Sequence, residues 1–149
     1  MEISVITNSH PIWDKTISFA ENCSWKAGTY LAKRMKNNEF EEVERVIVAT
    51  EDDIPVGFCT FSLKDELPED LGYSPFIGFV FVDEKYRGKR ISEKMISEAL
   101  NYAESNGYKT VYIMSGEIGL YEKYGFEKIG DMKTIYGTVD QLFQKKLTG

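Results

Sequence analysis

The residues whose types and spacing point most directly to chemistry form a basic turn at residues 87–92, with the sequence Arg-Gly-Lys-Arg-Ile-Ser. An apolar run at residues 76–82 precedes it, and a helical pattern starts near Ile91. The first N–H groups of a helix lack partners inside it, and the helix dipole puts partial positive charge there. Gly88 permits close approach of a ligand. The turn therefore predicts a phosphate site, with a solvated basic turn as the alternative.

The elements around this turn follow from hydrophobic periodicity. Residues 11–38 are predicted to form two helices, with a weak point at Gly28, and Ile91 begins a helix that the Asn106-Gly107 pair ends. A short helix is predicted at residues 117–124. The predicted strands are residues 43–49, 55–63, 76–82, 110–114, 126–129 and 141–147. The strand–helix–strand crossover favours parallel pairing of residues 76–82 with 110–114, which predicts a mixed α/β sheet with helices on both faces.

Composition limits the class of protein. The chain has 149 residues, 42% hydrophobic and 28% charged, so we expect one domain over residues 1–149. A formal net charge of −6 argues against nucleic-acid or anionic-membrane partners, and no apolar run is long enough to span a membrane. Two cysteines and one histidine form no metal-binding pattern, so no metal is expected. The start of the chain has no basic and then apolar stretch, and we expect a cytoplasmic location.

Besides the basic turn at residues 87–92, the sequence has a second distinctive segment at residues 119–126, Gly-Leu-Tyr-Glu-Lys-Tyr-Gly-Phe. Together the two segments resemble the GNAT superfamily of N-acetyltransferases. Residues 87–92, after the apolar strand, resemble its acetyl-CoA signature, which reads Gln or Arg, two residues, Gly, any residue, then Gly or Ala. Arg87 matches the first position, whereas Arg90 and Ser92 stand where the family has small residues. Residues 119–126 contain the second motif, Leu-Tyr-x-x-x-Gly-Phe, in full. The resemblance implies a mostly antiparallel mixed sheet with a central, splayed parallel strand pair.

The resemblance also implies a cofactor and its site. Backbone N–H groups of the basic turn would hold the pyrophosphate of acetyl-CoA, and the backbone of the preceding strand would pair with the pantetheine arm. The residues implied for cofactor binding are Val80, Phe81, Val82, Arg87, Gly88, Lys89, Arg90, Ile91 and Ser92. The side chains of the three strand residues are expected to belong to the core.

Tyr121 is the residue that the resemblance assigns to catalysis. Acetyl transfer expels a thiolate, and a phenol with a pKa near 10 can donate a proton to it. The alternative is that Tyr121 only packs in a short helix. An amine acceptor must also lose a proton, and five groups are candidates for the base, none of which the sequence singles out. They are Glu117, Asp65, Glu66, Glu21 and His10.

The resemblance implies a small-molecule primary amine as acceptor, attacked directly in a ternary complex. Aromatic and acidic walls would suit a cationic molecule. The residues in the regions implied for this site are Trp13, Trp25, Tyr30, Tyr73, Phe76, Glu66, Glu69 and Asp70. The alternatives are a peptide or protein N-acyltransferase and a non-catalytic acyl-CoA sensor. The last strands could serve as the interface of a homodimer.

Overall fold

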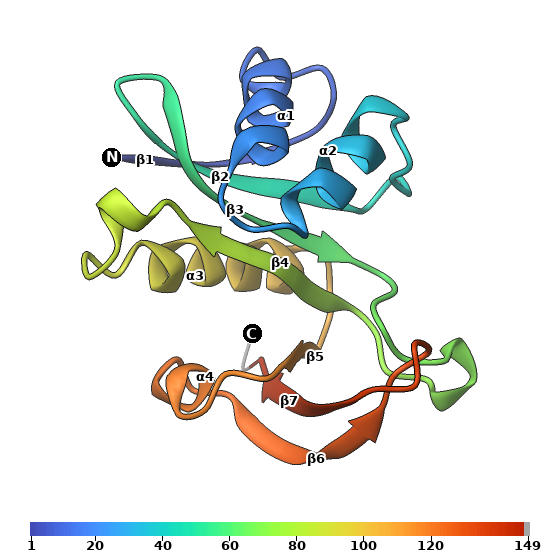
Figure 1. Ribbon diagram of the computed structural model, residues 1–149. Coiled ribbons are helices and arrows are strands. Elements are labelled where there is room, and N and C mark those ends of the chain that lie inside the picture. The colour runs from blue at the N-terminus through green and yellow to red at the C-terminus, as the bar shows by residue number, and fades with distance from the viewer. Residues whose placement is uncertain (148–149) are drawn as a thin grey trace.

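The computed structural model describes residues 1–147, which form one seven-stranded sheet with helices on both faces (Figure 1). The strand order is β1-β2-β3-β4-β5-β7-β6, and within the described residues only the β4–β5 pair is parallel. The strands are β1 (Glu2–Ile6), β2 (Arg45–Glu51), β3 (Ile54–Ser62), β4 (Phe76–Val82), β5 (Thr110–Ser115), β6 (Glu127–Lys133) and β7 (Val139–Lys146). The helices are α1 (Trp13–Asn22), α2 (Gly28–Lys36), α3 (Ile91–Ser105) and α4 (Leu120–Lys123), with 3-10 turns at Glu69–Leu71 and Glu84–Tyr86. The predicted fold class is confirmed.

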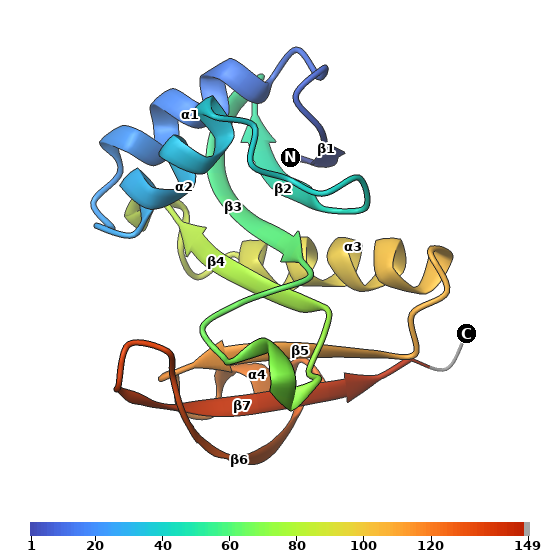
Figure 2. The same cartoon turned by 90° about the vertical axis from the view of Figure 1, so that its right-hand side faces the viewer.

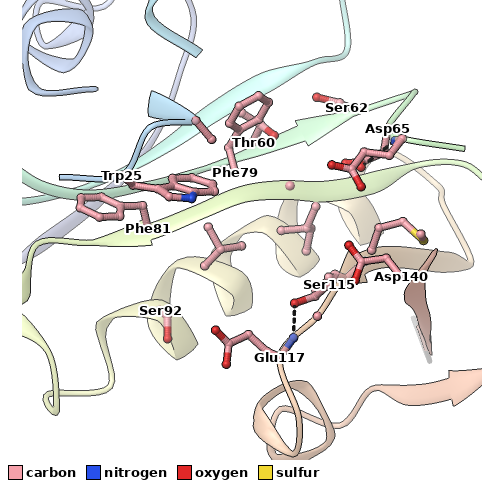
Figure 3. A pocket seen from close by; sticks show the side chains of 18 of the residues that line it. Trp25, Thr60, Ser62, Asp65, Phe79, Phe81, Ser92, Ser115, Glu117 and Asp140 are labelled. Carbon is pink, nitrogen blue, oxygen red and sulfur yellow. Dashed lines mark hydrogen bonds between the residues drawn. The ribbon is translucent and has the colours of Figure 1, made fainter. Parts of the chain in front are cut away.

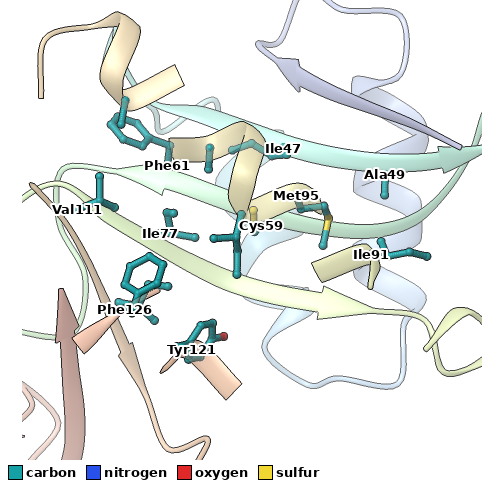
Figure 4. Close-up of a cluster of buried hydrophobic side chains, with 14 of the residues drawn as sticks. Ile47, Ala49, Cys59, Phe61, Ile77, Ile91, Met95, Val111, Tyr121 and Phe126 are labelled. Carbon is teal, nitrogen blue, oxygen red and sulfur yellow. The ribbon is translucent and has the colours of Figure 1, made fainter. Parts of the chain in front are cut away.

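Two apolar clusters hold the helices on opposite faces of the sheet. Along β2, Val46 and Val48 face α1 and α2, whereas Ile47 and Ala49 face α3. Both sets are fully buried, because helices cover both faces. Figure 4 shows part of the second cluster, in which Tyr121 of α4 joins side chains of α3 and the sheet.

The structure corrects the sequence analysis at the amino terminus. β1 precedes the helices and pairs antiparallel with β2, although the predicted order began with the helices. Its first four residues, Glu-Ile-Ser-Val, alternate polar and apolar side chains, which is a strand signal that is weak over so short a length. The two helices predicted within residues 11–38 are confirmed, and residues 23–27 turn the chain between them before Gly28 begins α2.

Candidate active site

The site is a cleft opened by the divergence of β4 from β5. The two strands pair at a single position, Phe76 with Tyr112, whereas β5 continues along β7 for six residue pairs. Beyond Phe76, the edge of β4 therefore has no strand partner in residues 1–147. The space between the diverging strands is a cleft of about 1260 Å³. Residues of β4, β5 and α4 line it, together with the α1–α2 and β3–β4 connections (Figure 3).

A bulge distorts β4 in the middle of this cleft. Between the pairs Phe58–Phe81 and Thr60–Gly78, one residue of β3 faces two residues of β4, Phe79 and Val80. Phe79 has a φ of +49°, a left-handed conformation that costs a non-glycine residue about 1–2 kcal/mol. Such bulges bend a strand and change the direction of its backbone groups. The bulge residues line the cleft, so their backbone groups lie where a ligand would enter.

The basic turn leads into α3 at one end of the cleft. Gly88 has a φ of +81°, and a Cβ built there would meet no atom within 4 Å. Among residues 1–147, no side chain caps the first turn of α3 with a hydrogen bond. A second hollow of about 630 Å³ lies against the turn, lined by Gly88, Arg90, Ile91 and Ser92 among others. Open space in front of uncapped helix amides fits a phosphate group. The Ser92 hydroxyl, 2.7 Å from that of Tyr124, links the start of α3 to α4.

The charged side chains of the turn lie outside that space or along its edge. The Arg90 side chain is 82% exposed, with its nearest carboxylate, Glu93, 3.6 Å away. Arg87 Nε donates a hydrogen bond to the carbonyl of Val82 at 3.0 Å, and its guanidinium lies 5.7 Å from the ring centre of Phe81. A ligand amide that bonds to the Val82 carbonyl must share it with Arg87 or displace the guanidinium. Lys89 lies 5.4 Å from the ring centre of Tyr86.

We expect Arg90→Gly to stabilise the protein. Arg90 adopts a left-handed backbone conformation (φ 60°, ψ 29°) just before α3, which glycine adopts at no steric cost. The gain in unfolding free energy is expected to be at most about 1 kcal/mol, since glycine also gains freedom in the unfolded chain. Urea denaturation measures the change. A clear loss of stability would show that the Arg90 side chain makes contacts that this structure lacks.

Tyr121 lies at the other wall of the cleft and is 4% exposed. Its ring packs against those of Tyr124, Phe126 and Phe143 at centroid distances of 6.1, 6.2 and 5.7 Å. Burial raises the pKa of its hydroxyl well above the usual value, the buried thiol of Cys59 adds to this rise, and the Ser115 hydroxyl opposes it. Tyr121 therefore stays protonated at neutral pH, the state required of a proton donor.

Four carboxylates line the cleft, and three of them, Asp65, Glu66 and Asp140, lie near one another. The four are Asp65 and Glu66 of the β3–β4 connection, Glu117 of the β5–α4 connection and Asp140 of β7. Burial raises the pKa of Asp65 to about 7, and burial followed by repulsion from Asp140 raises that of Glu66. The cleft is thus basic at its α3 end and acidic at the other, apart from Lys64 and Arg34. Lys64 pairs with Glu69, and Arg34 with Glu44.

The structure separates the predicted acceptor residues. Trp25 and Tyr30 line the cleft, and Trp25 stacks on Phe81 at 5.9 Å. Trp13 and Phe76 are buried in the core, and Tyr73 packs against Tyr112 at 5.1 Å. Of the acids, Glu69 pairs with Lys64 and Asp70 is exposed.

Three of the five candidate bases line the cleft, and two lie elsewhere. Asp65, Glu66 and Glu117 are among its lining residues. Glu21 forms an ion pair with Lys36 on the surface of the helix pair, and His10 Nδ1 accepts a hydrogen bond from the Ile12 amide at 3.1 Å.

Sequence reasoning missed several lining residues. Asp140 reaches the site because β7 lies between β5 and β6, so that its neighbour Gln141 pairs with Ser115. Thr60, Gly78 and Phe79 face the cleft because of the bulge. A glycine inside an apolar strand pattern is a known signal for a bulge or a close approach, and Gly78 could have been singled out on that ground.

Within residues 1–147, no group of three or more His, Cys, Asp or Glu residues is placed to hold a metal ion. None of the helices described is both long and apolar enough to cross a membrane.

The acetyltransferase (GNAT) family model matches residues 12–126, and the chain belongs to this family. The resemblance found in the sequence is thereby confirmed. The chain is 38% identical over 85 residues to the uncharacterised N-acetyltransferase YhbS of Escherichia coli, which covers 54% of this chain and 48% of that protein. It is 31% identical over 84 residues to the spermine/spermidine N(1)-acetyltransferase of Bacillus subtilis, covering 52% of this chain and 55% of that one. The chain thus spans about half the length of these curated relatives.

The fold is shared over a longer stretch than the sequence. An aminoglycoside 6'-N-acetyltransferase crystallised with coenzyme A superposes with a TM-score of 0.73 at 16% identity, covering 98% of this chain and 97% of that one. At this level of identity the likeness shows the fold.

Proposed function

We propose that this protein transfers an acetyl group from acetyl-CoA to a primary amine of a small cationic molecule, with residues 1–149 acting as one acetyltransferase domain. The observation that carries the proposal is the cleft itself, which has an uncapped helix start with basic residues at one end and three neighbouring carboxylates, Asp65, Glu66 and Asp140, at the other. The basic end, at the start of α3, suits the diphosphate of coenzyme A, and the acidic end suits an ammonium group. Relatives named for spermine, spermidine and aminoglycoside acetylation support a polyamine-like acceptor.

The proposed cofactor site uses the residues of the turn and the strand edge. Backbone amides from Gly88 to Ser92 would bind the diphosphate, with Arg87, Lys89 and Arg90 supplying positive charge. The backbone of β4 at Val80, Phe81 and Val82 would pair with the amides of the pantetheine arm, since this edge diverges from β5. A backbone N–H near the bulge would stabilise the oxyanion of the tetrahedral intermediate, a type of contact worth roughly 3 kcal/mol.

In the proposed reaction the amine attacks the thioester directly, and Tyr121 protonates the leaving thiolate. Neither cysteine is placed to act as a nucleophile. Cys59 is fully buried and its pKa is raised by that burial, which disfavours the thiolate. The Cys23 thiol donates to the carbonyls of Ala20 and Trp25 at 3.3 and 3.4 Å. These environments support a ternary complex without a covalent enzyme intermediate.

The experiment is a free-thiol assay with acetyl-CoA and a panel of amines. The panel contains spermidine, 1,4-diaminobutane, an aminoglycoside, a peptide with a free α-amine and glutamate as an anionic control. We expect the polyamines and aminoglycoside to exceed glutamate by about 100-fold or more in kcat/KM, which corresponds to the loss of one buried charge pair. Preference for the peptide would instead favour a peptide N-acyltransferase. Binding of coenzyme A without turnover on any amine would favour a sensor.

A further inference from the structure

We propose that Asp65 binds the reacting ammonium group of the acceptor and takes up its proton, an inference that rests on the proposed function. The sequence offered five candidate bases without a choice among them. The choice of Asp65 comes from its position, from the single partner of its carboxylate and from the charges around it.

The carboxylate of Asp65 lies directly over the backbone of β4 next to the bulge. A Cβ built on Gly78 would come within 2.7 Å of Asp65 Oδ2 and 3.4 Å of Thr60 Oγ1. Gly78 immediately precedes Phe79, the bulge residue with positive φ. Because Gly78 has no side chain, the Asp65 carboxylate can lie against the backbone of β4. This position is one residue away from Phe79, where β4 is distorted. Figure 3 shows Asp65 at this strand, on the same side of it as Ser62.

One oxygen of this carboxylate is held and the other is available. Oδ1 accepts a hydrogen bond from the Glu66 amide at 2.7 Å, which fixes the side chain. Oδ2 has no hydrogen-bond or ion-pair partner in residues 1–147. Every fully buried side-chain oxygen in these residues has a partner, so Oδ2 is not fully buried. Oδ2 must therefore be reached from outside, and Asp65 lines the cleft. An acceptor-only oxygen open to the cleft suits an ammonium donor.

The loop that carries Asp65 is anchored to the second half of the sheet. The Glu66 carbonyl accepts a hydrogen bond from the Ile135 amide of the β6–β7 turn at 2.7 Å. Leu67 is buried against Phe76 and Leu142. These contacts hold Asp65 in a fixed position relative to β4. A catalytic group must be positioned in this way to contact a reacting atom.

The charges facing Asp65 leave it without a full counter-ion. Burial is the largest cause of its raised pKa of about 7, and the charges of Glu66 of the same loop and Asp140 of β7 raise it further. The hydrogen bond from the Glu66 amide and the charge of Arg34 of α2 oppose this rise. Arg34 is engaged elsewhere, 3.1 Å from Glu44 and 3.0 Å from the Ser62 hydroxyl. A bound ammonium would supply the missing positive charge. A base with a pKa near 7 is also well matched to proton transfer at neutral pH.

The other cleft carboxylates are less well placed for this role. Glu66 is less deeply buried than Asp65 and has no atom among those nearest to the Gly78 backbone. Glu117 is exposed on the connection after β5, so its carboxylate is not desolvated. Asp140 lies on the β5 side of the cleft, where its Oδ1 would be 3.3 Å from a Cβ on Gly116. These groups are positioned to bind a second cationic group of a polyamine rather than the reacting one.

The step balances as follows in atoms and protons. The acceptor enters as R–NH3⁺, and one proton moves to Asp65 Oδ2. The nitrogen lone pair then forms the C–N bond to the acetyl carbon, the C–S bond breaks, and its electron pair passes to sulfur. Tyr121 gives its proton to that sulfur and recovers one from the attacking nitrogen. The products are the amide, the thiol and one proton, which Asp65 releases to solvent.

The test compares Asp65→Asn with Asp70→Asn, an exposed aspartate on the same loop that is not among the residues lining the cleft, although the sequence analysis placed it near the acceptor. We expect Asp65→Asn to lower kcat/KM for spermidine at pH 7.5 by about 100-fold or more. Asp70→Asn is expected to leave it unchanged. Thermal shifts with coenzyme A show whether each variant is folded, and Asp65→Asn should respond like the wild type because the cofactor end is untouched.

The pH profile separates a base from a merely structural residue. Wild-type kcat/KM should rise with pH through about 7 for both 1,4-diaminobutane and its less basic 2,2-difluoro analogue, because Asp65 must lose its proton first. In Asp65→Asn the midpoint should instead follow the pKa of each amine, since only the free amine reacts. Unchanged activity, or reduced activity with the wild-type profile, would overturn the role of Asp65. A wild-type protein inactive on every amine would contradict the proposed function and this inference together.

Discussion

Replacing Tyr121 with phenylalanine is expected to lower kcat for acetyl transfer by about 100-fold or more, while the affinity for coenzyme A stays within about twofold of the wild type. The phenol is the group placed to protonate the leaving thiolate, and its raised pKa keeps it protonated up to pH 10 and beyond. The substitution keeps the ring, so its packing against Phe126 and Phe143 is preserved. The rate of thiol release at saturating substrates gives kcat, and calorimetric titration gives the affinity for coenzyme A.

Tyr124→Phe is the matched control for this prediction. It removes the hydroxyl that lies 2.7 Å from that of Ser92, but Tyr124 is not placed at the reacting end of the cleft. We expect a larger effect on coenzyme A affinity than on kcat. Equal kcat in Tyr121→Phe and the wild type would show that water or another group protonates the thiolate. A loss of cofactor affinity without loss of kcat would assign Tyr121 to binding instead.

Gly28→Ala is expected to lower the free energy of unfolding by about 3 kcal/mol, at the upper end of what overpacking costs. Gly28 begins α2 where the chain passes closest to α1. A Cβ there would lie 2.3 Å from the Ala20 carbonyl oxygen and 2.6 Å from the Cys23 sulfur. The sulfur can move, but the carbonyl belongs to the backbone of α1. Relief therefore requires the two helices to shift apart.

Gly130→Ala is the control, because its nearest contact would be Met132 Sδ at 3.9 Å, an ordinary distance. Urea denaturation of both variants measures the difference. A neutral or stabilising Gly28→Ala, as helix propensity alone would give, would contradict the close approach of α1 and α2. Activity should fall as well, because the α1–α2 connection carries Trp25, which stacks on Phe81 at the cleft.

Local signals in the sequence predicted the elements at the basic end of the site, because these elements follow one another along the chain. The strand at residues 76–82, the turn at 87–92 and the helix from Ile91 are neighbours along the chain, so periodicity and turn chemistry are enough to find them. The parallel pairing with residues 110–114 followed from the crossover and is confirmed.

The acidic half of the site depends on contacts that the sequence does not encode locally. Asp140 approaches Asp65 only because β7 lies between β5 and β6, a pairing between distant segments. Asp65 was one of several charged residues in a predicted loop, and its burial against β4 depends on Gly78 and on the anchoring of Leu67. The bulge at Phe79 interrupts an apolar run in which Gly78 is the one local signal of an irregularity, and that glycine does not tell a bulge from a close approach.

A crystal structure of the protein with coenzyme A tests the central claim most directly. The cleft between β4 and β5 is predicted to hold the pantetheine arm, with the diphosphate within hydrogen-bond distance of the backbone amides of residues 88–92. The thiol should point toward Tyr121. A diphosphate bound elsewhere, or an empty cleft at saturating coenzyme A, would contradict the account.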